Sequence, residues 1–195
     1  FLRAAIFMTR LQGKDPRKAG ANGDIDLVAI AARRFPTHAR VNYADSAAAQ
    51  ARAFATESGM SYAPIVEMLR SPALQPSLAQ LSRSRRSELA RLLPELLDHD
   101  STLPTPEPMT DSRQRQQLFD TLLRTIVPEP GPLILLLDDL QWCDPETLAW
   151  LLYLLNHRAG ARLLLVTTAR SEELTPDHPA AGFMLEASRL GLGEN

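Results

Sequence analysis

The 195-residue sequence has one cysteine, Cys143, and no apolar run near the roughly 18 residues that a membrane-spanning helix needs. A single cysteine excludes an internal disulfide framework and fits a protein kept in a reducing cytosol. The net charge is only −2, so nothing in the charge balance favours binding to nucleic acid or an anionic membrane. Four histidines are scattered without metal-site spacing. We therefore predict a cytoplasmic protein that contacts neither nucleic acid nor membrane directly.

Apolar residues make up 45% of the chain, and five consecutive large apolar residues occupy positions 133–137. The run follows a segment rich in proline and glycine and ends in Asp138 and Asp139. Its shortness and lack of polar alternation predict a strand buried on both faces, as in a parallel sheet covered by helices. Such sheets bind ligands at the carboxyl ends of their strands. The two aspartates are therefore the predicted functional centre.

The pattern downstream of this strand completes a βαβ unit. Asp144 is placed to cap a helix that has Pro145 at its first position and ends near Gly160. A second apolar strand, Leu163–Thr168, leads into Ala169 and Arg170. Two strands joined by one helix are expected to run parallel, which brings Arg170 to the same sheet edge as the aspartates.

The other apolar patterns have mostly helical spacing. A short strand is expected at Ala4–Met8. Helices are predicted over Ile25–Phe35, the second half of the alanine-rich stretch Val41–Ser58, Tyr62–Arg70, Leu74–Leu81, Leu89–Leu97 with a break at Pro94, the segment that follows a cap at Thr110 or Asp111, and a short stretch after residue 179.

A strand that ends in two aspartates has a known use in phosphoryl transfer. Mg²⁺ takes one or two carboxylates together with waters and phosphate oxygens, and a neighbouring acid can orient the attacking water. A guanidinium such as that of Arg170 can meet a terminal phosphate through paired hydrogen bonds. Two alternatives stay open: the aspartates merely begin a turn, and Arg170 forms a surface ion pair with Glu172 or Glu173.

A complete phosphate-binding loop is not recognisable in the sequence. That loop needs Gly, four residues and then Gly-Lys-Ser/Thr, because backbone amides wrap the phosphates and the hydroxyl meets Mg²⁺. Gly13-Lys14 is the single Gly-Lys pair, but Met8 stands at the first glycine position and Asp15 at the hydroxyl position. The segment is either a degenerate phosphate loop or a solvated polar turn.

Cys143 lies beside a helix N-terminus, a place that can lower a thiol pKa. No histidine is near it in sequence, so we interpret Cys143 as structural. Trp142 and Trp150 are expected to pack in the core.

Taken together, these motifs resemble the AAA/STAND-type P-loop ATPase domain of large bacterial regulators, including LuxR-type proteins and those with a bacterial transcriptional activator domain. The specific match is Leu135-Leu136-Leu137-Asp138-Asp139-Leu140-Gln141-Trp142-Cys143-Asp144, followed by Glu146-Thr147-Leu148 and residues 164–173. Weaker matches lie at Glu57-Ser58-Gly59, Tyr62-Ala63-Pro64, residues 69–74 and residues 89–97.

The resemblance implies a doubly wound parallel sheet that binds ATP and Mg²⁺ at its strand ends. By motif match, Asp138 takes the Mg²⁺ role, Asp139 is the second Walker B acid that activates water, and Arg170 is a sensor-like arginine that contacts the nucleotide. Domains of this kind act as switches in which nucleotide state controls self-association or an attached output domain.

The chain departs from that pattern at both ends. Residues 1–40 match the expected first strand and Walker A loop poorly, and the lid expected after residue 195 is absent. We therefore expect a fragment with an incomplete P-loop NTPase-like sheet, divided into residues 1–40 and a partial ATPase domain over 41–195. The alternative is a degenerate, non-hydrolysing module that serves protein–protein interaction.

Overall fold

The computed structural model describes residues 5–10, 47–57, 59–127, 133–157, 163–190 and 193–194. Five parallel strands form one sheet in the order β2-β3-β4-β1-β5. They are β1 (Ala5–Arg10), β2 (Ala47–Arg52), β3 (Leu133–Asp138), β4 (Leu163–Ala169) and β5 (Gly193–Glu194). The predicted α/β class, a parallel sheet with flanking helices, is confirmed.

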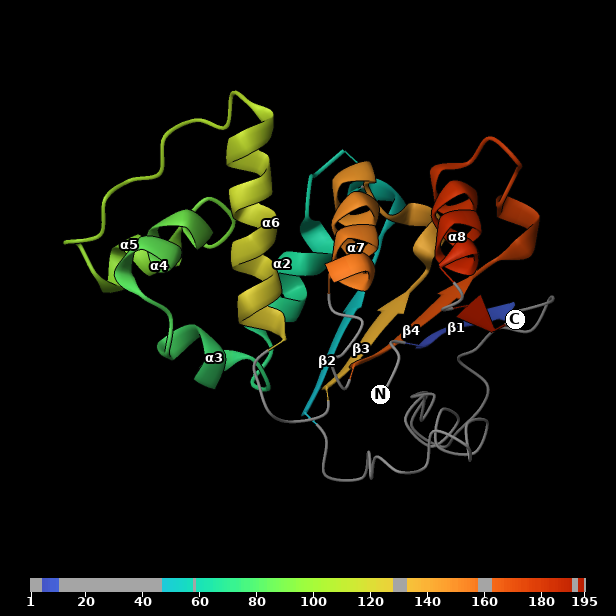
Figure 1. Ribbon diagram of the computed structural model, residues 1–195, viewed down its shortest axis with the longest axis horizontal. Coiled ribbons are helices and arrows are strands. Elements are labelled where there is room, and N and C mark those ends of the chain that lie inside the picture. The colour runs from blue at the N-terminus through green and yellow to red at the C-terminus, as the bar shows by residue number, and fades with distance from the viewer. Residues whose placement is uncertain are drawn as a thin grey trace.

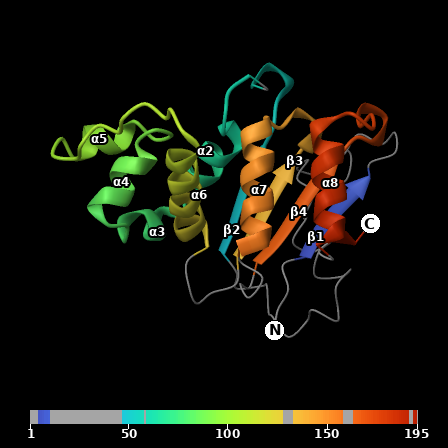
Figure 2. The same cartoon turned by 45° about the horizontal axis from the view of Figure 1, so that its top comes forward.

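Three of the helices lie side by side on one face of this sheet, namely α6 (Ser112–Ile126), α7 (Pro145–His157) and α8 (Pro179–Arg189) (Figures 1 and 2). The other described helices are α2 (Ala63–Arg70), α3 (Gln75–Ala79), α4 (Arg83–Leu89), α5 (Glu95–His99) and the 3-10 turns η4 (Ala55–Glu57), η5 (Leu140–Trp142) and η6 (Ser171–Glu173). Helices α3–α5 form a lobe on the side of α6 that faces away from α7 (Figure 1). No helix of the described ranges is long and apolar enough to cross a membrane.

The core lies between the sheet and its helical layer. Alternate residues of β3, such as Leu135 and Leu137, pack with Trp150 of α7 in one apolar cluster. Ile134 and Leu136, which point to the opposite face, are buried as well. The absence of polar alternation in this strand therefore reflects burial on both faces, as predicted. Each such leucine contributes about 2 kcal/mol through the removal of its side chain from water.

Side-chain caps define where the two long helices begin. Asp111 accepts a hydrogen bond from the backbone N–H of Gln114 at 2.8 Å, and the Gln114 side chain accepts from the backbone N–H of Asp111 at 3.3 Å. Asp144 accepts from the backbone N–H of Thr147 at 2.9 Å and from its hydroxyl at 2.6 Å. Both caps satisfy helix N–H groups that otherwise lack partners, and they confirm the predicted helix starts.

One predicted element is wrong. The alanine-rich stretch expected to be helical contains the strand β2, which pairs in parallel with β3 from Ala47 to Arg52. Alanine favours helix locally, but the pairing with β3 and the packing of α2 against β2 override that preference. The small side chains of Ala49 and Ala51 fit this buried position.

Helices are present at the other predicted positions after residue 60, with one difference: α4 ends at Leu89, so the first part of the predicted Leu89–Leu97 helix is not helical, and α5 begins at Glu95 after the predicted break at Pro94. The first strand, doubtful from sequence, is present as β1 and occupies the position between β4 and β5. The helix predicted over Ile25–Phe35 and the turn around Gly13-Lys14 lie outside the described residues.

Candidate functional site

The strand ends bring three side chains of interest to one edge of the sheet. Arg52 ends β2 and is paired in register with Asp138 at the end of β3. The register of β3 with β4 matches Leu137 with Thr167, which places Thr168 beside Asp138. The parallel arrangement thus confirms that the aspartates and the end of β4 share an edge.

Asp138 is an anchored carboxylate that remains open to solvent. Its Oδ1 accepts a hydrogen bond from the Thr168 hydroxyl, and its Oδ2 lies 3.7 Å from Nε of Arg52. About a third of the side chain is exposed. A fixed, accessible carboxylate oxygen is what a hard cation such as Mg²⁺ requires from a protein.

Asp139 has a left-handed backbone conformation, with φ 58° and ψ 50°. Aspartate tolerates this region better than most residues because its short polar side chain can hydrogen-bond locally. The backbone N–H of Asp139 donates to the Thr168 hydroxyl at 3.0 Å. One threonine therefore fixes both acids, since its hydroxyl donates to Asp138 and accepts from Asp139.

The Asp139 carboxylate is buried, and both of its oxygens are engaged. Oδ2 accepts from Nε and Nη2 of Arg52 at 2.9 and 2.6 Å. Oδ1 accepts from Nε2 of Gln141 at 3.1 Å and lies 3.7 Å from Nε of Arg170. In this arrangement a water molecule can hydrogen-bond to Oδ2 only after Arg52 moves away.

Arg170 follows β4 directly and contacts two acids. Its Nη1 lies 3.2 Å from Oε1 of Glu173, so the alternative of a local ion pair with Glu173 is realised. Its Nε also faces Asp139, and nearly half of the side chain is exposed. The structure therefore places Arg170 beside the second acid with its guanidinium partly open.

Three members of this site did not emerge from the sequence. The alanine-rich sequence predicts a helix over β2, and a helix there would not place Arg52 beside Asp138. Gln141 falls within the matched motif, but nothing in its spacing indicated that its side chain returns to Asp139. Thr168 lies within the predicted apolar strand, and its position near the carboxyl end of that strand, two residues before Arg170, is a usable signal.

Asp144 and Cys143, which follow the strand end and precede helix α7, have structural roles. Both carboxylate oxygens of Asp144 bind Thr147, and the residue is buried. Burial and the neighbouring Asp144 charge raise the pKa of the Cys143 thiol to about 12. Desolvation therefore outweighs any pKa-lowering effect of the helix N-terminus, and the interpretation of Cys143 as structural is supported.

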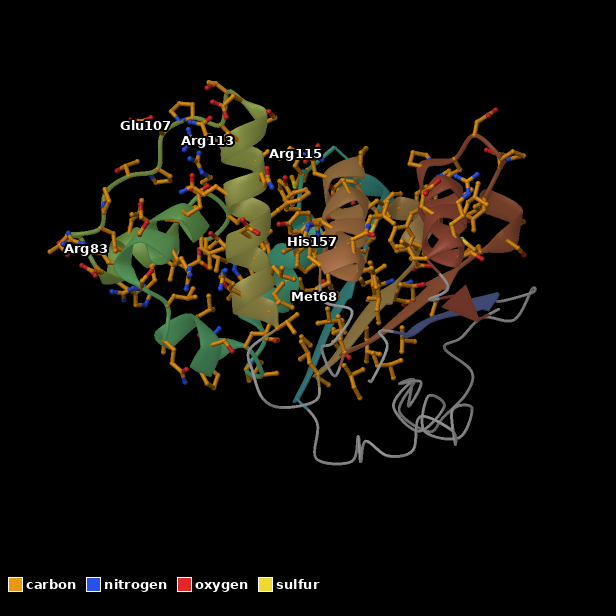
Figure 3. All side chains as sticks on the ribbon, in the orientation of Figure 1. Met68, Arg83, Glu107, Arg113, Arg115 and His157 are labelled. Atoms are coloured by element: carbon orange, nitrogen blue, oxygen red, sulfur yellow. The ribbon has the colours of Figure 1, made fainter. Side chains whose placement is uncertain are left out.

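A second polar cluster joins the helical layer, formed by Tyr62, Arg115 and Glu146. Glu146 Oε2 accepts from Nε of Arg115 at 2.7 Å and from the Tyr62 hydroxyl at 2.8 Å. Arg115 also lies over the ring of Phe119, and Figure 3 shows it on the side of α6 toward α7. Burial opposes ionisation of Glu146, but its two hydrogen bonds prevail and lower its pKa.

The metal-side residues fit a Mg²⁺ ion, while the phosphate-side candidates are not described. Within the described ranges there is no group of three or more histidine, cysteine or acidic side chains that could hold a metal. Mg²⁺ does not need such a group, because waters and phosphate oxygens fill most of its positions, and Asp138 offers the carboxylate. Gly13-Lys14 and Asp15 lie outside the described residues, so both interpretations of that turn remain predictions.

Comparison with known proteins gives a family assignment. No curated protein and no solved structure matches the chain significantly. A family model described as AAA ATPase domain matches residues 27–166, a span that covers β2, β3 and the first half of β4. The match includes Asp138 and Asp139 and extends over more than half of the sequence. The fold is thus P-loop NTPase-like, and the chain belongs to the AAA ATPase domain family.

Proposed function

We propose that this chain is an ATP-binding regulatory switch domain from a multidomain signal-transduction or transcriptional regulator of the STAND type. The observation that carries the proposal is the meeting of Asp138, Asp139 and Arg170 at the ends of β3 and β4. Residues 41–195 would form the partial ATPase domain and residues 1–40 its N-terminal segment. Its partners would be other domains of the parent protein or further copies of itself, in the cytoplasm.

Each residue of the Walker B half has a separate task in this proposal. Asp138, whose side chain is about a third exposed, would hold Mg²⁺, and the ion would neutralise negative charge on the phosphates. Asp139 would orient the attacking water and accept its proton, as the water oxygen bonds to the γ-phosphorus and the bond from that phosphorus to the ADP oxygen breaks. Arg170 donates hydrogen bonds to the terminal phosphate, whose negative charge competes with Glu173 for the guanidinium.

Hydrolysis requires Arg52 to move. While Arg52 donates two hydrogen bonds to Oδ2 of Asp139, that oxygen has no free lone pair directed at water. A bound nucleotide, with its own negative charge, offers Arg52 an alternative partner at the same edge of the sheet. We therefore interpret the described arrangement as the resting state of the switch.

Binding is tested by titrating the chain with a fluorescent ATP analogue in the presence of Mg²⁺. We expect Asp138→Ala to weaken Mg²⁺-dependent binding at least about tenfold, because the metal loses its protein ligand. Asp98→Ala is the matched control, since Asp98 is an exposed aspartate in α5 of the remote helical lobe. Equal affinities of the two variants would contradict the assignment of Asp138.

Turnover is tested separately by measuring phosphate release from ATP. Asp139→Asn keeps the shape of the side chain but removes the base, so we expect at least about a hundredfold loss of kcat with little change in affinity. If the unaltered chain and the Asp139→Asn variant release phosphate equally slowly, the domain is not an ATPase in this form.

The second candidate is a non-hydrolysing module that uses the same fold for protein–protein interaction. It is favoured by the engagement of both Asp139 oxygens and by Asp15, which stands where a phosphate loop has a hydroxyl. Lys14→Ala discriminates the two functions in the binding assay. A degenerate phosphate loop predicts weaker nucleotide binding, while a polar turn predicts no change.

A further inference from the structure

Gln141 is a buried glutamine whose side-chain nitrogen and oxygen are both hydrogen-bonded at the candidate site. It lies in the middle of η5, two residues after Asp139, and only 3% of its surface is exposed. Its Nε2 donates to Oδ1 of Asp139 at 3.1 Å, and its Oε1 accepts from the backbone N–H of Arg170 at 3.2 Å.

The orientation of this amide follows from its partners. A carboxylate can only accept a hydrogen bond and a backbone N–H can only donate one, so the nitrogen must face Asp139 and the oxygen must face Arg170. A flipped amide would put oxygen against carboxylate and N–H against N–H. Because the site is buried, each lost bond would leave a polar group without compensation from water.

The turn that carries Gln141 is held at both ends. The backbone N–H of Trp142 donates to the Asp139 carbonyl at 2.9 Å, and that of Cys143 donates to the Leu140 carbonyl at 3.1 Å. The Thr168 side chain also joins the ends of β3 and β4, but it contacts the Asp138 carboxylate and the Asp139 backbone rather than the Asp139 carboxylate. Among the described contacts, Gln141 is the one hydrogen-bonded side chain that joins the Asp139 carboxylate to Arg170.

We infer that Gln141 is a positioning residue that couples the Asp139 carboxylate to the backbone of Arg170. It fixes Oδ1 of Asp139, so that Oδ2 is the oxygen presented to water once Arg52 has moved. A shift of Arg170 toward a terminal phosphate is transmitted through the same amide to the acid. The catalytic part of this inference rests on the proposed function, whereas the coupling itself does not.

The coupling is tested without nucleotide by residue-resolved hydrogen exchange of the Arg170 backbone amide. We expect Gln141→Met to speed this exchange about tenfold, because the amide loses its acceptor. Asp139→Ala should speed it in the unaltered background, by loosening Gln141, and add nothing in the Gln141→Met background. An equal effect of Asp139→Ala in both backgrounds would overturn the inference.

Two further variants control for general damage. Gln141→Asn keeps an amide but is one methylene too short to span both partners, so it should behave like Gln141→Met. Gln75→Met removes a glutamine hydrogen bond of 3.3 Å to the Leu69 carbonyl in the helical lobe, and it should leave Arg170 exchange unchanged. Thermal unfolding of each variant shows that it is folded at the temperature of measurement.

Turnover provides the second readout. In an active chain, Gln141→Met should lower kcat about tenfold while KM changes less than about threefold, because the acid is misplaced but the nucleotide contacts remain. A parallel rise in KM, or an unchanged kcat, would contradict the positioning role. If the unaltered chain shows no turnover, the hydrolysis proposal fails, and the exchange experiment still decides whether Gln141 couples the two residues.

Discussion

The ion pair at the strand ends and the ion pair in the helical layer have different surroundings. At the strand ends, Arg52 pairs with Asp139, whose side chain is only 9% exposed. In the helical layer, Arg115 pairs with Glu146, whose side chain is 34% exposed. Asp139 of the first pair also contacts Gln141, Thr168 and Arg170. Among the residues that the structure describes, Tyr62 is the one further hydrogen-bond partner of Glu146 in the second pair.

The two pairs differ in burial, and this difference decides how costly each is to break. A buried carboxylate that loses its partner keeps a charge that water cannot solvate, so the pair is costly to break. A half-exposed carboxylate regains water when its partner leaves, and the loss is small. Any group that displaces Arg52 must therefore compensate the charge of the buried Asp139 carboxylate.

The largest effect is expected from removing the cation of the buried pair. Arg52→Met should lower the free energy of unfolding by about 2 kcal/mol, less than the 3–5 kcal/mol of a fully buried pair because Arg52 itself is a third exposed. Urea unfolding measures the change. Arg189→Met, which breaks the exposed pair with Glu186, is the control and should cost less than about 0.5 kcal/mol. Equal losses of unfolding free energy in Arg52→Met and Arg189→Met would contradict the distinction between buried and exposed pairs.

A smaller effect is expected in the helical layer. Arg115→Met should cost about 1 kcal/mol, because Glu146 keeps its hydrogen bond from Tyr62 and becomes more hydrated. The substitution also removes the guanidinium from the Phe119 ring, 4.7 Å from its centroid. A double-mutant cycle with Glu146→Gln isolates the pairwise part, for which we expect about 0.5 kcal/mol. A coupling energy larger than that of Arg52 with Asp139 would show that the more exposed pair is the stronger one.

The stability contributed by Glu146 should depend on pH in a defined direction. Its pKa in the folded chain is lower than the ordinary value of 4.5, so the unfolded chain binds more protons as the pH falls. The contribution is therefore present above pH 4.5 and disappears as the pH falls through the folded pKa. The stability difference between the unaltered chain and Glu146→Gln, about 0.5 kcal/mol at neutral pH, should vanish in acid. A difference that grows in acid would contradict the assigned shift.

Thiol labelling gives the smallest expected change. Cys143 lies between the acids and helix α7, and its raised pKa leaves about a thousandfold less thiolate at pH 8 than the ordinary value of 9.0 would. Labelling with iodoacetamide should be slow in the folded chain. Arg52→Met should increase the rate about threefold by loosening the strand ends, and Arg115→Met should leave it unchanged. Equal acceleration by both variants would show that the two clusters are not independent.

Much of the architecture followed from local patterns, because strands β3 and β4 are apolar on both faces and the intervening helix has an explicit cap. The helix prediction for the residues of strand β2 was wrong, because alanine has no preference for strands. Pairing with β3 decides the conformation of this segment. The hydrophobic pattern predicts which segments form helices or strands. It does not predict which segments far apart in the chain pair with one another.

The same limit applies to the site. Asp138, Asp139 and Arg170 could be placed at one edge because the carboxyl ends of parallel strands coincide. Their roles stay predictions. Arg52 and Gln141 could not be found from sequence, because a salt bridge across 87 positions and a side chain that folds back onto its own turn leave no periodic signal. Such contacts become visible only in three dimensions.

The two tryptophans give this domain a pair of built-in optical reporters. Trp150 is fully buried in the core, where its indole N–H lies 3.4 Å from the Phe119 carbonyl, so its emission follows global unfolding. Trp142 is partly buried and follows Gln141 in η5, where solvent access depends on the local turn. With Trp150→Phe, the remaining tryptophan fluorescence would follow the turn beside the acids alone, and its quenching by iodide would report changes in solvent access at that turn.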